Sequence, residues 1–513
     1  MSLVATTLHL IKKMTSSFLS TLITTSEKQA DKTAFVINGE NFSYEVFYQK
    51  VNTIANKLLA ENKSQQKVIV ATHNDFETYA SIIAIWLTGN SYIPLNFKEP
   101  NNKLKNIIKT LKPDILLTSK PTEQKFLSEL KILNTRNLND TTRIIDLNKI
   151  KPENIAYTLF TSGTTGTPKG VPISYKNLNA FVDSFLSENY SISDEDVFLQ
   201  MADLTFDMSI ISFLIPLCIG AKIVTVNPKD IKYLATYQAL EENDISVLIT
   251  APSTLQLLEP YYAEINLKQL KYTFIGAEAF YESTAKEWQK CAPNSRIVNL
   301  YGPSEGGILA SSHQWNDNNC SHNRIVSIGK PVKNINLHIV DSNGKTIENS
   351  TKGEIWISGE QVFDGYLNPL ENEGKFDYLT INGVQEKCFK TGDLAFRDDN
   401  GNLFYCGRLD HQVKIQGQRV ELTEIEHFAS QHSTEFKPVA LCYKDQFNSN
   451  KIALFVENGT DETLLRSTLK TNLPSYMIPS KIIKIEALPL NKNQKTDLNK
   501  LKSFLKVDTT SRK

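Results

Sequence analysis

The chain has few cysteines and no long apolar run. Six cysteines are scattered among 513 residues, and no two of them form a CxxC pair. This pattern predicts free thiols in a reducing compartment and no zinc site. No segment reaches the roughly 18 apolar residues that a membrane span needs. The apolar start, residues 1–10, lacks the basic residues that precede the apolar part of a signal peptide. We therefore expect a cytoplasmic protein that does not enter a membrane.

The chain also has no excess of charge of either sign and no internal repeat. It carries 56 basic and 56 acidic side chains, which indicates no nucleic-acid-binding surface. With 41% hydrophobic and 22% charged residues, its composition is that of a globular protein. A chain of 513 residues is too long for a single core, so we expect at least two domains. Met14 offers a second start, and we expect residues 1–17 to be an extension without a role in the fold.

Residues 161–170 form a loop rich in glycine and threonine that ends in Lys169 and Gly170. The apolar run before it, residues 155–160, predicts a short buried strand. Glycines allow backbone N–H groups to approach an anion, and hydroxyls and an ammonium complete the shell. A Walker loop would place serine or threonine after the lysine. The stretch thus predicts a phosphate-binding loop of another kind; the alternative is an ordinary mobile surface loop.

The remaining pattern predicts three regions. Strands and helices alternate through residue 150 and again through residues 177–300, which predicts an α/β fold with a largely parallel sheet. The apolar strands expected at 244–250, 272–276 and 296–300 each lead into a loop at the edge where open α/β sheets bind ligands. Short strands and turns from residue 325 predict a β-rich subdomain. The pattern after Asp410 predicts a compact α+β domain of about a hundred residues.

The loop at 161–170 resembles the phosphate loop of the adenylate-forming superfamily, which includes acyl-CoA synthetases, nonribosomal peptide synthetase adenylation domains and luciferases. Residues 299–305 (Asn-Leu-Tyr-Gly-Pro-Ser-Glu) resemble its second signature, and residues 390–393 and 407–410 resemble its ribose-binding motifs. The resemblance covers nearly the whole chain from about residue 18. It implies a large N-terminal domain of layered α/β subdomains plus a β-rich subdomain, and a small C-terminal α+β lid domain. The expected boundaries are 1–17 for the extension, 18–409 for the adenylation core and 410–513 for the lid, with Asp410 as the hinge.

The resemblance also assigns nucleotide-binding roles. It implies that Tyr301 stacks on adenine, that Asn299 bonds the adenine amino edge and that Ser304 contacts the α-phosphate. Relatives usually have threonine where Ser304 stands, and the hydroxyl is retained. Asp393 would accept hydrogen bonds from the ribose hydroxyls, and Arg408 would contact ribose and phosphate. The alternatives are an ordinary Tyr-Gly-Pro turn and a turn aspartate. The full set of expected nucleotide contacts is Ser162, Gly163, Thr164, Thr165, Gly166, Gly276, Ala277, Glu278, Asn299, Tyr301, Gly302, Ser304, Asp393 and Arg408.

Four residues are the expected catalytic groups: Thr161, Lys169, Glu305 and Lys495. By the resemblance, Glu305 holds Mg²⁺ between the phosphates of ATP. Relatives usually read Asn-Gly-Lys near the C-terminus, and that lysine is catalytic. Here Gln494 replaces the glycine, so Lys495 is the candidate and Lys492 the alternative.

Asp207 interrupts the apolar run at residues 204–211. A carboxylate is costly to bury without a partner, and one interpretation is that Asp207 caps the next helix. The amino-acid-activating branch of the superfamily carries Phe-Asp here, and that aspartate pairs with the substrate ammonium. Matching to such pockets gives Asp207, Met208, Ile211, Thr250, Phe274, Gly276, Leu300, Ile308 and Leu309, with Lys495 on the carboxylate. The bulky Met208 and Leu300 predict a shallow pocket for glycine first, then alanine or serine; the alternative is that they repack around a deeper pocket.

The expected activity is ATP- and Mg²⁺-dependent conversion of a small amino acid to an aminoacyl-adenylate. The aminoacyl group would then pass to the phosphopantetheine thiol of a separate carrier protein, because too few residues follow Lys495 for a carrier domain. D-alanine–carrier protein ligases share this size and the Phe-Asp feature. One alternative is an acyl- or aryl-CoA synthetase that uses coenzyme A, against which Asp207 argues. Another is a non-catalytic binding protein, against which the retained motif residues argue.

Overall fold

The structure is a computed structural model. It describes residues 17–61, 63–122, 125–127, 129–138, 145–163, 168–227, 230–316, 321–347, 350–410, 412–433, 437–445, 449–490 and 496–505. The chain divides into two compact units. Unit 1 comprises Met1–Asn96, Leu111–Phe160 and Gly170–Leu409, and unit 2 comprises Phe97–Thr110, Thr161–Lys169 and Asp410–Lys513. Each unit is described by itself.

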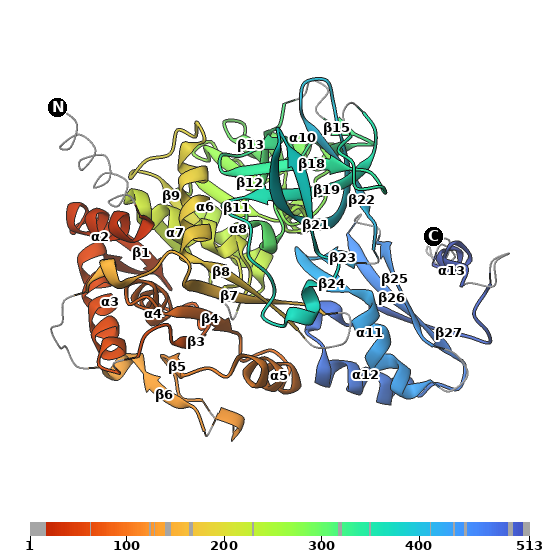
Figure 1. Ribbon diagram of the computed structural model, residues 1–513, viewed down its shortest axis with the longest axis horizontal. Helices are drawn as coiled ribbons and strands as arrows, with labels where there is room; N and C mark the ends of the chain where they lie inside the picture. Colours follow the sequence, from red (N-terminus) through yellow and green to blue (C-terminus); the bar gives the residue numbers. More distant parts are fainter. Residues whose placement is uncertain are drawn as a thin grey trace. The chain divides into compact units, whose positions relative to one another are not determined.

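A six-stranded sheet in the order β6-β5-β3-β4-β7-β8 forms one layer of unit 1 (Figure 1). Its strands are β3 (Lys67–Ala71), β4 (Ser91–Leu95), β5 (Ile115–Thr118), β6 (Lys131–Asn134), β7 (Ile155–Thr161) and β8 (Lys169–Ser174). The pairs from β6 to β7 are parallel. Strands β4 and β5 are buried along their whole length, which explains why most of their side chains are apolar. The crossover between β3 and β4 is α4 (Phe76–Leu87), whose first turn is capped by the Asp75 carboxylate.

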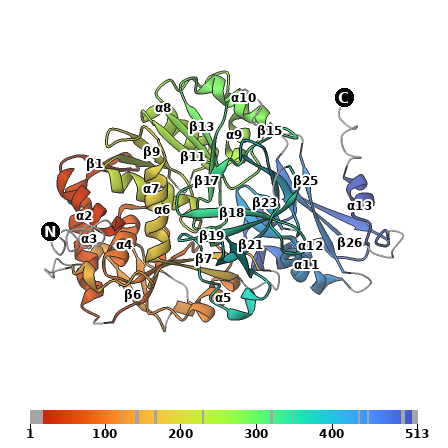
Figure 2. The same ribbon diagram turned by 45° about the horizontal axis from the view of Figure 1, so that its top comes forward.

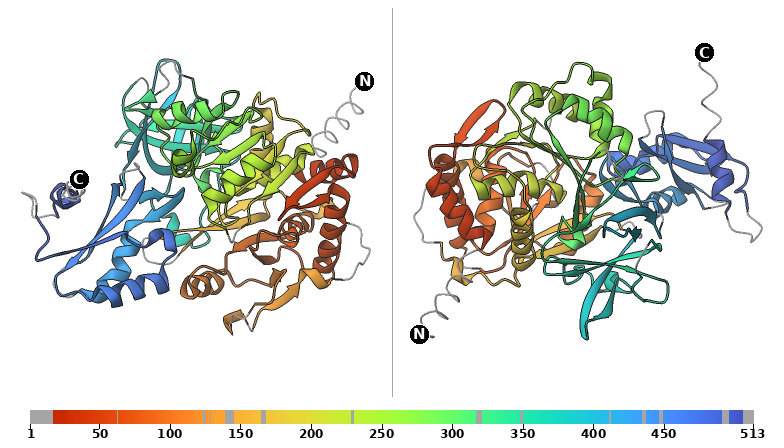
Figure 3. Two further views of the ribbon diagram at one scale, coloured as in Figure 1. Left: turned by 180° about the vertical axis from the view of Figure 1, so that it is seen from behind. Right: turned by 90° about the horizontal axis from the view of Figure 1, so that it is seen from above.

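A nine-stranded sheet forms a second layer, in the order β17-β14-β13-β12-β11-β9-β10-β1-β2. Its strands are β1 (Thr33–Ile37), β2 (Glu40–Ser43), β9 (Val197–Gln200), β10 (Lys222–Thr225), β11 (Val247–Thr250), β12 (Tyr272–Ile275), β13 (Arg296–Tyr301), β14 (Ser311–Gln314) and β17 (Lys330–Pro331). The β1–β2 hairpin, red in Figure 3, turns at Asn38 and Gly39, which both have positive φ. Two central residues with positive φ are typical of the two-residue turns that join hairpin strands, and Asn-Gly is a preferred pair for them.

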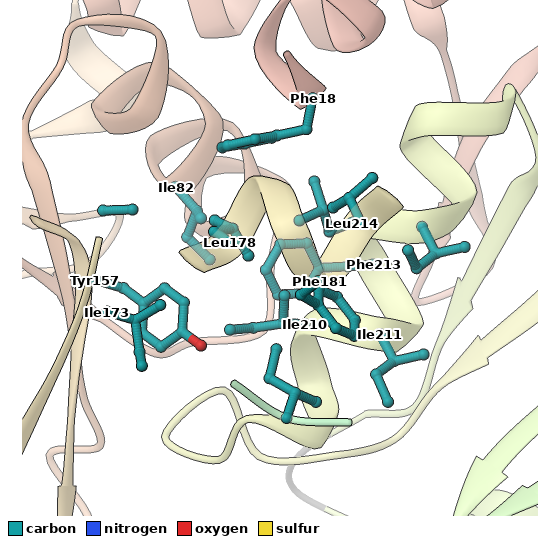
Figure 4. Close-up of a cluster of buried hydrophobic side chains, with 14 of the residues drawn as sticks. Phe18, Ile82, Tyr157, Ile173, Leu178, Phe181, Ile210, Ile211, Phe213 and Leu214 are labelled. Atoms are coloured by element: carbon teal, nitrogen blue, oxygen red, sulfur yellow. The ribbon is translucent and has the colours of Figure 1, made fainter. Parts of the chain in front are cut away.

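Helices from several parts of the chain cover this sheet. They are α2 (Phe18–Lys28), α3 (Tyr44–Leu59), α6 (Tyr175–Ser187), α7 (Met208–Ile219), α8 (Lys232–Glu242), α9 (Pro252–Leu258) and α10 (Glu282–Cys291). Side chains of α8, α9 and α10 form one cluster with β11 and β12. Figure 2 shows these three helices in the same part of the molecule as β11. On the other side, α6 and α7 pack with β7 and β8 into the main core, where Tyr157, Ile173, Phe181 and Phe213 gather (Figure 4).

Helix α7 is apolar on all sides, as expected for a helix enclosed by the core. Every residue from Ser209 to Cys218 is buried, and the helix ends at Gly220 in the left-handed region. Asp207 immediately precedes it at the N-cap position. The core therefore fixes the position of this aspartate.

A five-stranded antiparallel sheet completes unit 1. It consists of β18 (Ile335–Val340), β19 (Gly353–Gly359), β20 (Phe376–Ile381), β21 (Val384–Arg397) and β22 (Leu403–Arg408). Asp393 on β21 is the register partner of Arg408 on β22. The antiparallel register thus brings the two ribose motifs side by side. Two short strands, β15 (Ser321–His322) and β16 (Ile325–Val326), pair separately.

Unit 2 is an α+β assembly. Its elements are α5 (Asn101–Leu111), the hairpin β23 (Gln412–Ile415) and β24 (Gln418–Glu421), α11 (Leu422–Ala429), the sheet of β25 (Val439–Lys444), β26 (Asn450–Glu457) and β27 (Lys481–Ile485), α12 (Glu462–Asn472) and α13 (Leu498–Phe504). Val420, Ile425, Leu454 and Leu465 belong to its core. These elements and those of unit 1 confirm the expected fold class. Among the described residues, no helix has the length and apolar character needed to cross a bilayer.

Candidate active site

The ribose motifs meet in a buried hydrogen-bonded group. Asp393 Oδ2 accepts from the Tyr301 hydroxyl at 2.8 Å, and Asp393 Oδ1 accepts from Arg408 Nη1 at 2.6 Å. Arg408 Nη2 also donates to the Thr391 carbonyl at 3.1 Å, and the Asp393 N–H donates to the Thr391 hydroxyl. Burial, together with the Asp393 carboxylate, raises the pKa of Tyr301 well above its usual value. The phenol therefore stays protonated and orients the carboxylate by donating to it.

Asn299 and Gly302 lie at the end of β13 and in the loop after it. The Asn299 amide NH₂ donates to the carbonyls of Val326 and Ser327, at 3.3 and 2.8 Å. This orientation leaves the amide oxygen to accept from an amino group. A Cβ on Gly302 would lie 2.3 Å from the Ile308 carbonyl oxygen, so the loop needs glycine there.

Ile308 has a φ of +80° although it is β-branched. Such a backbone is strained and is held by the surrounding structure, and strain of this kind clusters at functional sites. Ala277, in the expected nucleotide-binding loop after β12, has a φ of +68°. Its neighbour Glu278 accepts a hydrogen bond at 3.0 Å from the Ser253 N–H in the first turn of α9. The structure therefore gives Glu278 a capping contact that the sequence did not predict.

Ser304 and Asp207 are in direct contact. Ser304 begins the short 3₁₀ helix η5 (Ser304–Gly306), and its hydroxyl donates to Asp207 Oδ2. The Asp207 side chain makes no capping bond to α7. The capping interpretation of Asp207 is therefore wrong. A residue expected at the α-phosphate and one expected at the substrate ammonium are joined by a hydrogen bond.

Glu305 is fully buried, and its Oε1 accepts from the Tyr366 hydroxyl at 2.6 Å. The backbone carbonyl of Glu305 also accepts from the Phe363 N–H at 3.0 Å. Tyr366 was not among the expected site residues. It stands in the stretch Asp-Gly-Tyr-Leu, 61 residues after Glu305, and nothing in that local pattern indicates a contact with a distant carboxylate.

The nine residues expected to line the substrate pocket all belong to unit 1. Ile211, Thr250, Phe274, Gly276, Leu300, Ile308 and Leu309 are buried, whereas Asp207 and Met208 are half-buried. A Cβ added to Gly276 would lie 3.3 Å from the Leu300 carbonyl oxygen and 3.8 Å from Met208 Cε. Behind Phe274, the rings of Phe185 and Tyr190 pack with centroids at 5.5 and 4.9 Å.

The phosphate-loop residues belong to unit 2. The Ser162 hydroxyl donates to the Arg419 carbonyl at 2.8 Å, and Gly163 donates its N–H to the Glu424 carboxyl. Thr161 and Lys169 are half-buried. The expected residues Thr164, Thr165, Gly166 and Lys495, and the alternative Lys492, lie outside the described residues.

Two carboxyl groups of unit 2 are buried beside this loop. Burial raises the pKa of Glu424 to about 7, although the charge of Lys103 opposes the shift. Burial also raises the pKa of Glu421, against the charges of Arg419 and Lys169. Within the described part of the chain, no group of three or more His, Cys, Asp or Glu side chains is arranged to hold a metal ion.

Comparisons with known proteins agree with this arrangement. The sequence profile of AMP-binding enzymes matches residues 22–367. The chain is 29% identical to a D-alanine–D-alanyl carrier protein ligase of Bacillus licheniformis, over 94% of this chain and 98% of the ligase. It is 28% identical to tyrocidine synthase 1 of Brevibacillus parabrevis over 92% of its length, and it spans 43% of that protein.

Among solved structures, the chain is similar to the Vibrio cholerae adenylation domain AlmE in complex with glycyl-adenosine-5'-phosphate. The TM-score is 0.84 at 23% identity, covering 96% of this chain and 98% of that one. This likeness shows the fold, a large N-terminal and a small C-terminal domain. With the profile match over most of its length, the chain belongs to the AMP-binding enzyme family.

Proposed function

We propose that the protein uses ATP to convert a small amino acid to an aminoacyl-adenylate and transfers the aminoacyl group to a carrier-protein thiol. The observation that carries this proposal is the Asp207 carboxylate, fixed at the start of a buried helix and bonded to Ser304 of the nucleotide motif. An acid without an ammonium group would gain nothing from this carboxylate. The relatives include D-alanine–carrier protein ligases, which supports amino acid activation followed by carrier loading.

We propose that residues of unit 1 bind the adenosine part of the nucleotide. Asp393 is oriented by Tyr301 and Arg408, and each carboxylate oxygen retains a lone pair after these bonds. Asp393 would therefore accept from the ribose hydroxyls without losing its neighbours. Asn299 would accept from the adenine amino group through its amide oxygen, and Tyr301 would stack on the ring.

A magnesium ion fits the residues that are present. Mg²⁺ is usually held by one or two carboxylates, substrate phosphates and water, and Glu305 supplies a buried carboxylate oriented by Tyr366. When bound, Mg²⁺ would offset negative charge on the phosphate oxygens. Glu305 would hold the ion, and Lys169, Thr161 and Lys495 would position the phosphates and the attacking carboxylate by hydrogen bonding and charge.

Glycine is the proposed first substrate, followed by alanine and serine. The Met208 methyl lies 3.8 Å from the position that a Cβ on Gly276 would take, and the Leu300 Cβ lies 3.6 Å from the same position, which supports a small space for a substrate side chain. The Phe274 ring packs against the rings of Phe185 and Tyr190, which fill space on one side of it. The glycyl-adenylate of AlmE and the D-alanine of the ligases are both small, which supports the same size class.

The test is amino-acid-dependent ATP–pyrophosphate exchange with all common L- and D-amino acids, and with fatty and aryl acids as controls. We expect exchange with one small amino acid. Asp207→Asn should lower kcat/KM for that amino acid by about 30-fold or more, because loss of one partner of a desolvated charge pair costs about 2–5 kcal/mol.

Asp203→Asn is the matched control, since Asp203 is a half-buried aspartate of the same segment whose bonds to Thr205 and Asn96 are structural. It should retain the exchange activity of the unsubstituted enzyme. Exchange with a fatty or aryl acid alone, unchanged in Asp207→Asn, would contradict the proposal and indicate an acyl- or aryl-CoA synthetase. Incubation with phosphopantetheinylated carrier protein and with coenzyme A then identifies the acceptor.

A further inference from the structure

We infer that Glu354 is a positioning residue for nucleotide recognition, whose carboxylate holds the turn at Gly392 so that Asp393 is presented to the ribose hydroxyls. This role rests on the proposed function, in which Asp393 binds the ribose, and deepens it. Glu354 lies on β19 and was not among the expected site residues.

Strand β21 bulges away from β19 at its ribose motif. Trp356 of β19 is the register partner of Lys390, whereas Glu354 is the partner of Leu394. From 356 to 354 the register advances two residues on β19, while from 390 to 394 it advances four on β21. Gly392 lies in this bulge and has a φ of +73°. A bulge disrupts the ladder locally and re-aims side chains, and bulges are common beside active sites.

Side chains replace the ladder bonds that the bulge loses. The Gly392 N–H donates to Glu354 Oε1 at 2.8 Å. The Thr391 hydroxyl donates to the Ile355 carbonyl at 2.7 Å and accepts from the Asp393 N–H at 2.9 Å. A backbone N–H withdrawn from water needs an acceptor, and a hydrogen bond to a carboxylate is stronger than one between neutral groups. Glu354 therefore fixes the peptide group before Gly392.

The Glu354 carboxylate is itself fixed. Its Oε2 accepts from the indole N–H of Trp356 at 2.9 Å, so both of its oxygens have protein donors. Trp356 is buried, which fixes the direction of that indole. On the other side of the turn, the Gly392 carbonyl accepts from the Leu409 N–H at 2.8 Å. Both peptide groups that flank Gly392 are thus held, and the second of them leads directly into Asp393.

The side chain and the backbone of Asp393 are held by different groups. Tyr301 and Arg408 orient its carboxylate, whereas the turn decides where its Cα lies. Without Glu354, Gly392 would gain access to the many backbone conformations that glycine permits, and Asp393 would be presented over a range of positions. Preorganisation improves affinity because less ordering remains to be done when the ligand binds. Glu354 therefore contributes to ribose recognition without touching the ribose.

The experiment compares ATP with 2′-deoxyATP and 3′-deoxyATP, each of which lacks one ribose hydroxyl. Dissociation constants are measured by calorimetry on the full chain with Mg²⁺ and without an amino acid, so that no adenylate forms. The ratio of each deoxynucleotide constant to the ATP constant isolates the contribution of that hydroxyl. We expect ratios of about tenfold or more in the unsubstituted enzyme, the size of a hydrogen bond to a charged group. A merely structural defect would weaken all three nucleotides alike and leave the ratios unchanged.

We expect Glu354→Ala to reduce both ratios by about 3–10-fold, because Asp393 is then less well placed. Glu354→Gln offers one acceptor oxygen to two donors, so it should reduce the ratios by a smaller factor. Glu386→Ala is the matched control, since Glu386 of β21 also bonds a side chain of β19, that of Ser358, and it should leave the ratios unchanged.

Ratios unchanged in Glu354→Ala but lost in Asp393→Ala would overturn the role of Glu354 and leave the proposed function intact. If the alanine variant does not fold, unchanged ratios in Glu354→Gln would overturn that role equally. Ratios near one in the unsubstituted enzyme would overturn both the role of Glu354 and the assignment of Asp393 to the ribose. Amino-acid-dependent exchange then decides the proposed reaction separately.

Discussion

Met208 follows Asp207 at the start of α7, and its terminal methyl faces the strand end that carries Gly276. We propose that a side chain on a substrate held by Asp207 meets this methyl group. The sequence predicts a shallow pocket because Met208 and Leu300 are bulky where several relatives with large substrates have alanine or glycine. The 3.8 Å separation between Met208 Cε and the position that a Cβ on Gly276 would take supplies a geometric reason.

We therefore predict that Met208→Ala shifts preference toward larger amino acids. Each methylene accommodated or excluded is worth about 1–3 kcal/mol of discrimination, so kcat/KM for valine relative to glycine should rise by at least about tenfold. The measurement is exchange kinetics with glycine, alanine and valine. Met201→Ala makes the same substitution at a buried methionine outside the expected pocket and should leave the ratio unchanged. An unchanged ratio in Met208→Ala would show that another wall sets the size limit.

The identity of the motif residues is readable from the sequence, whereas the bonds among them are not. Tyr301 and Asp393 were both expected to contact adenosine, yet their hydrogen bond joins residues 92 positions apart. The contact of Tyr366 with Glu305 is of the same kind. Short motifs specify local backbone and side-chain chemistry, but cross-contacts depend on how three separate sheets and their loops fold together.

For strands, too, the position along the chain can be predicted from the sequence, whereas the long-range contacts cannot. The strands predicted at 155–160, 272–276 and 296–300 agree with β7, β12 and β13 to within one residue, because apolar periodicity and turn residues are local signals. The assignment of strands to sheets is not local. Strand β1 pairs with β10, nearly 190 residues later, whereas β3 and β4 belong to the other large sheet.

We predict that the free energy of unfolding depends on pH through Glu424, which lies on helix α11. Burial raises the pKa of Glu424 from 4.5 to about 7, and its Oε2 has no hydrogen-bond partner among the described residues. The folded state therefore binds this proton more tightly than the unfolded state does. As pH rises from about 4.5 to 7, the unfolded chain loses the proton first, so the free energy of unfolding decreases over this range.

Glu424→Gln removes the charge and should flatten this dependence. A shift of this size corresponds to at most about 3 kcal/mol, so the variant should be more stable than the unsubstituted protein at pH 7.5 and similar at pH 4.5. Urea unfolding of the full chain, followed by circular dichroism from pH 4.5 to 8, measures the effect. Glu462→Gln, an exposed helical glutamate paired with Arg466, is the control. Parallel pH profiles for Glu424→Gln and the unsubstituted protein would refute the prediction.

At the scale of the whole molecule, the chain forms two units, and the long C-terminal segment of unit 2 begins at Asp410. The Gly-Arg-Leu-Asp motif led to a predicted hinge at that residue. The sequence contains no local sign that Phe97–Thr110 and Thr161–Lys169 group with the C-terminal segment. Such grouping depends on contacts between segments more than 200 residues apart, as between Ser162 and Arg419.

The proposed reaction has two halves, adenylate formation and transfer to a thiol, and we propose that the lid reorients about Asp410 between them. Proline fixes φ near −65° and restricts the preceding residue, so Asp410→Pro should hinder reorientation without touching the groups that bind adenosine or the amino acid. We predict that ATP–pyrophosphate exchange stays within about threefold of the unsubstituted enzyme, while aminoacyl transfer to carrier protein falls by at least about tenfold, as expected for a hinge that limits turnover. Single-turnover transfer from preformed adenylate separates the two steps.

The control is Asp410→Ala, which removes the same side chain, including its bond to the Gln412 N–H. The backbone of this variant keeps its freedom, so we expect it to transfer the aminoacyl group normally. Equal losses in the alanine and proline variants would assign the effect to the side chain and remove the hinge from Asp410.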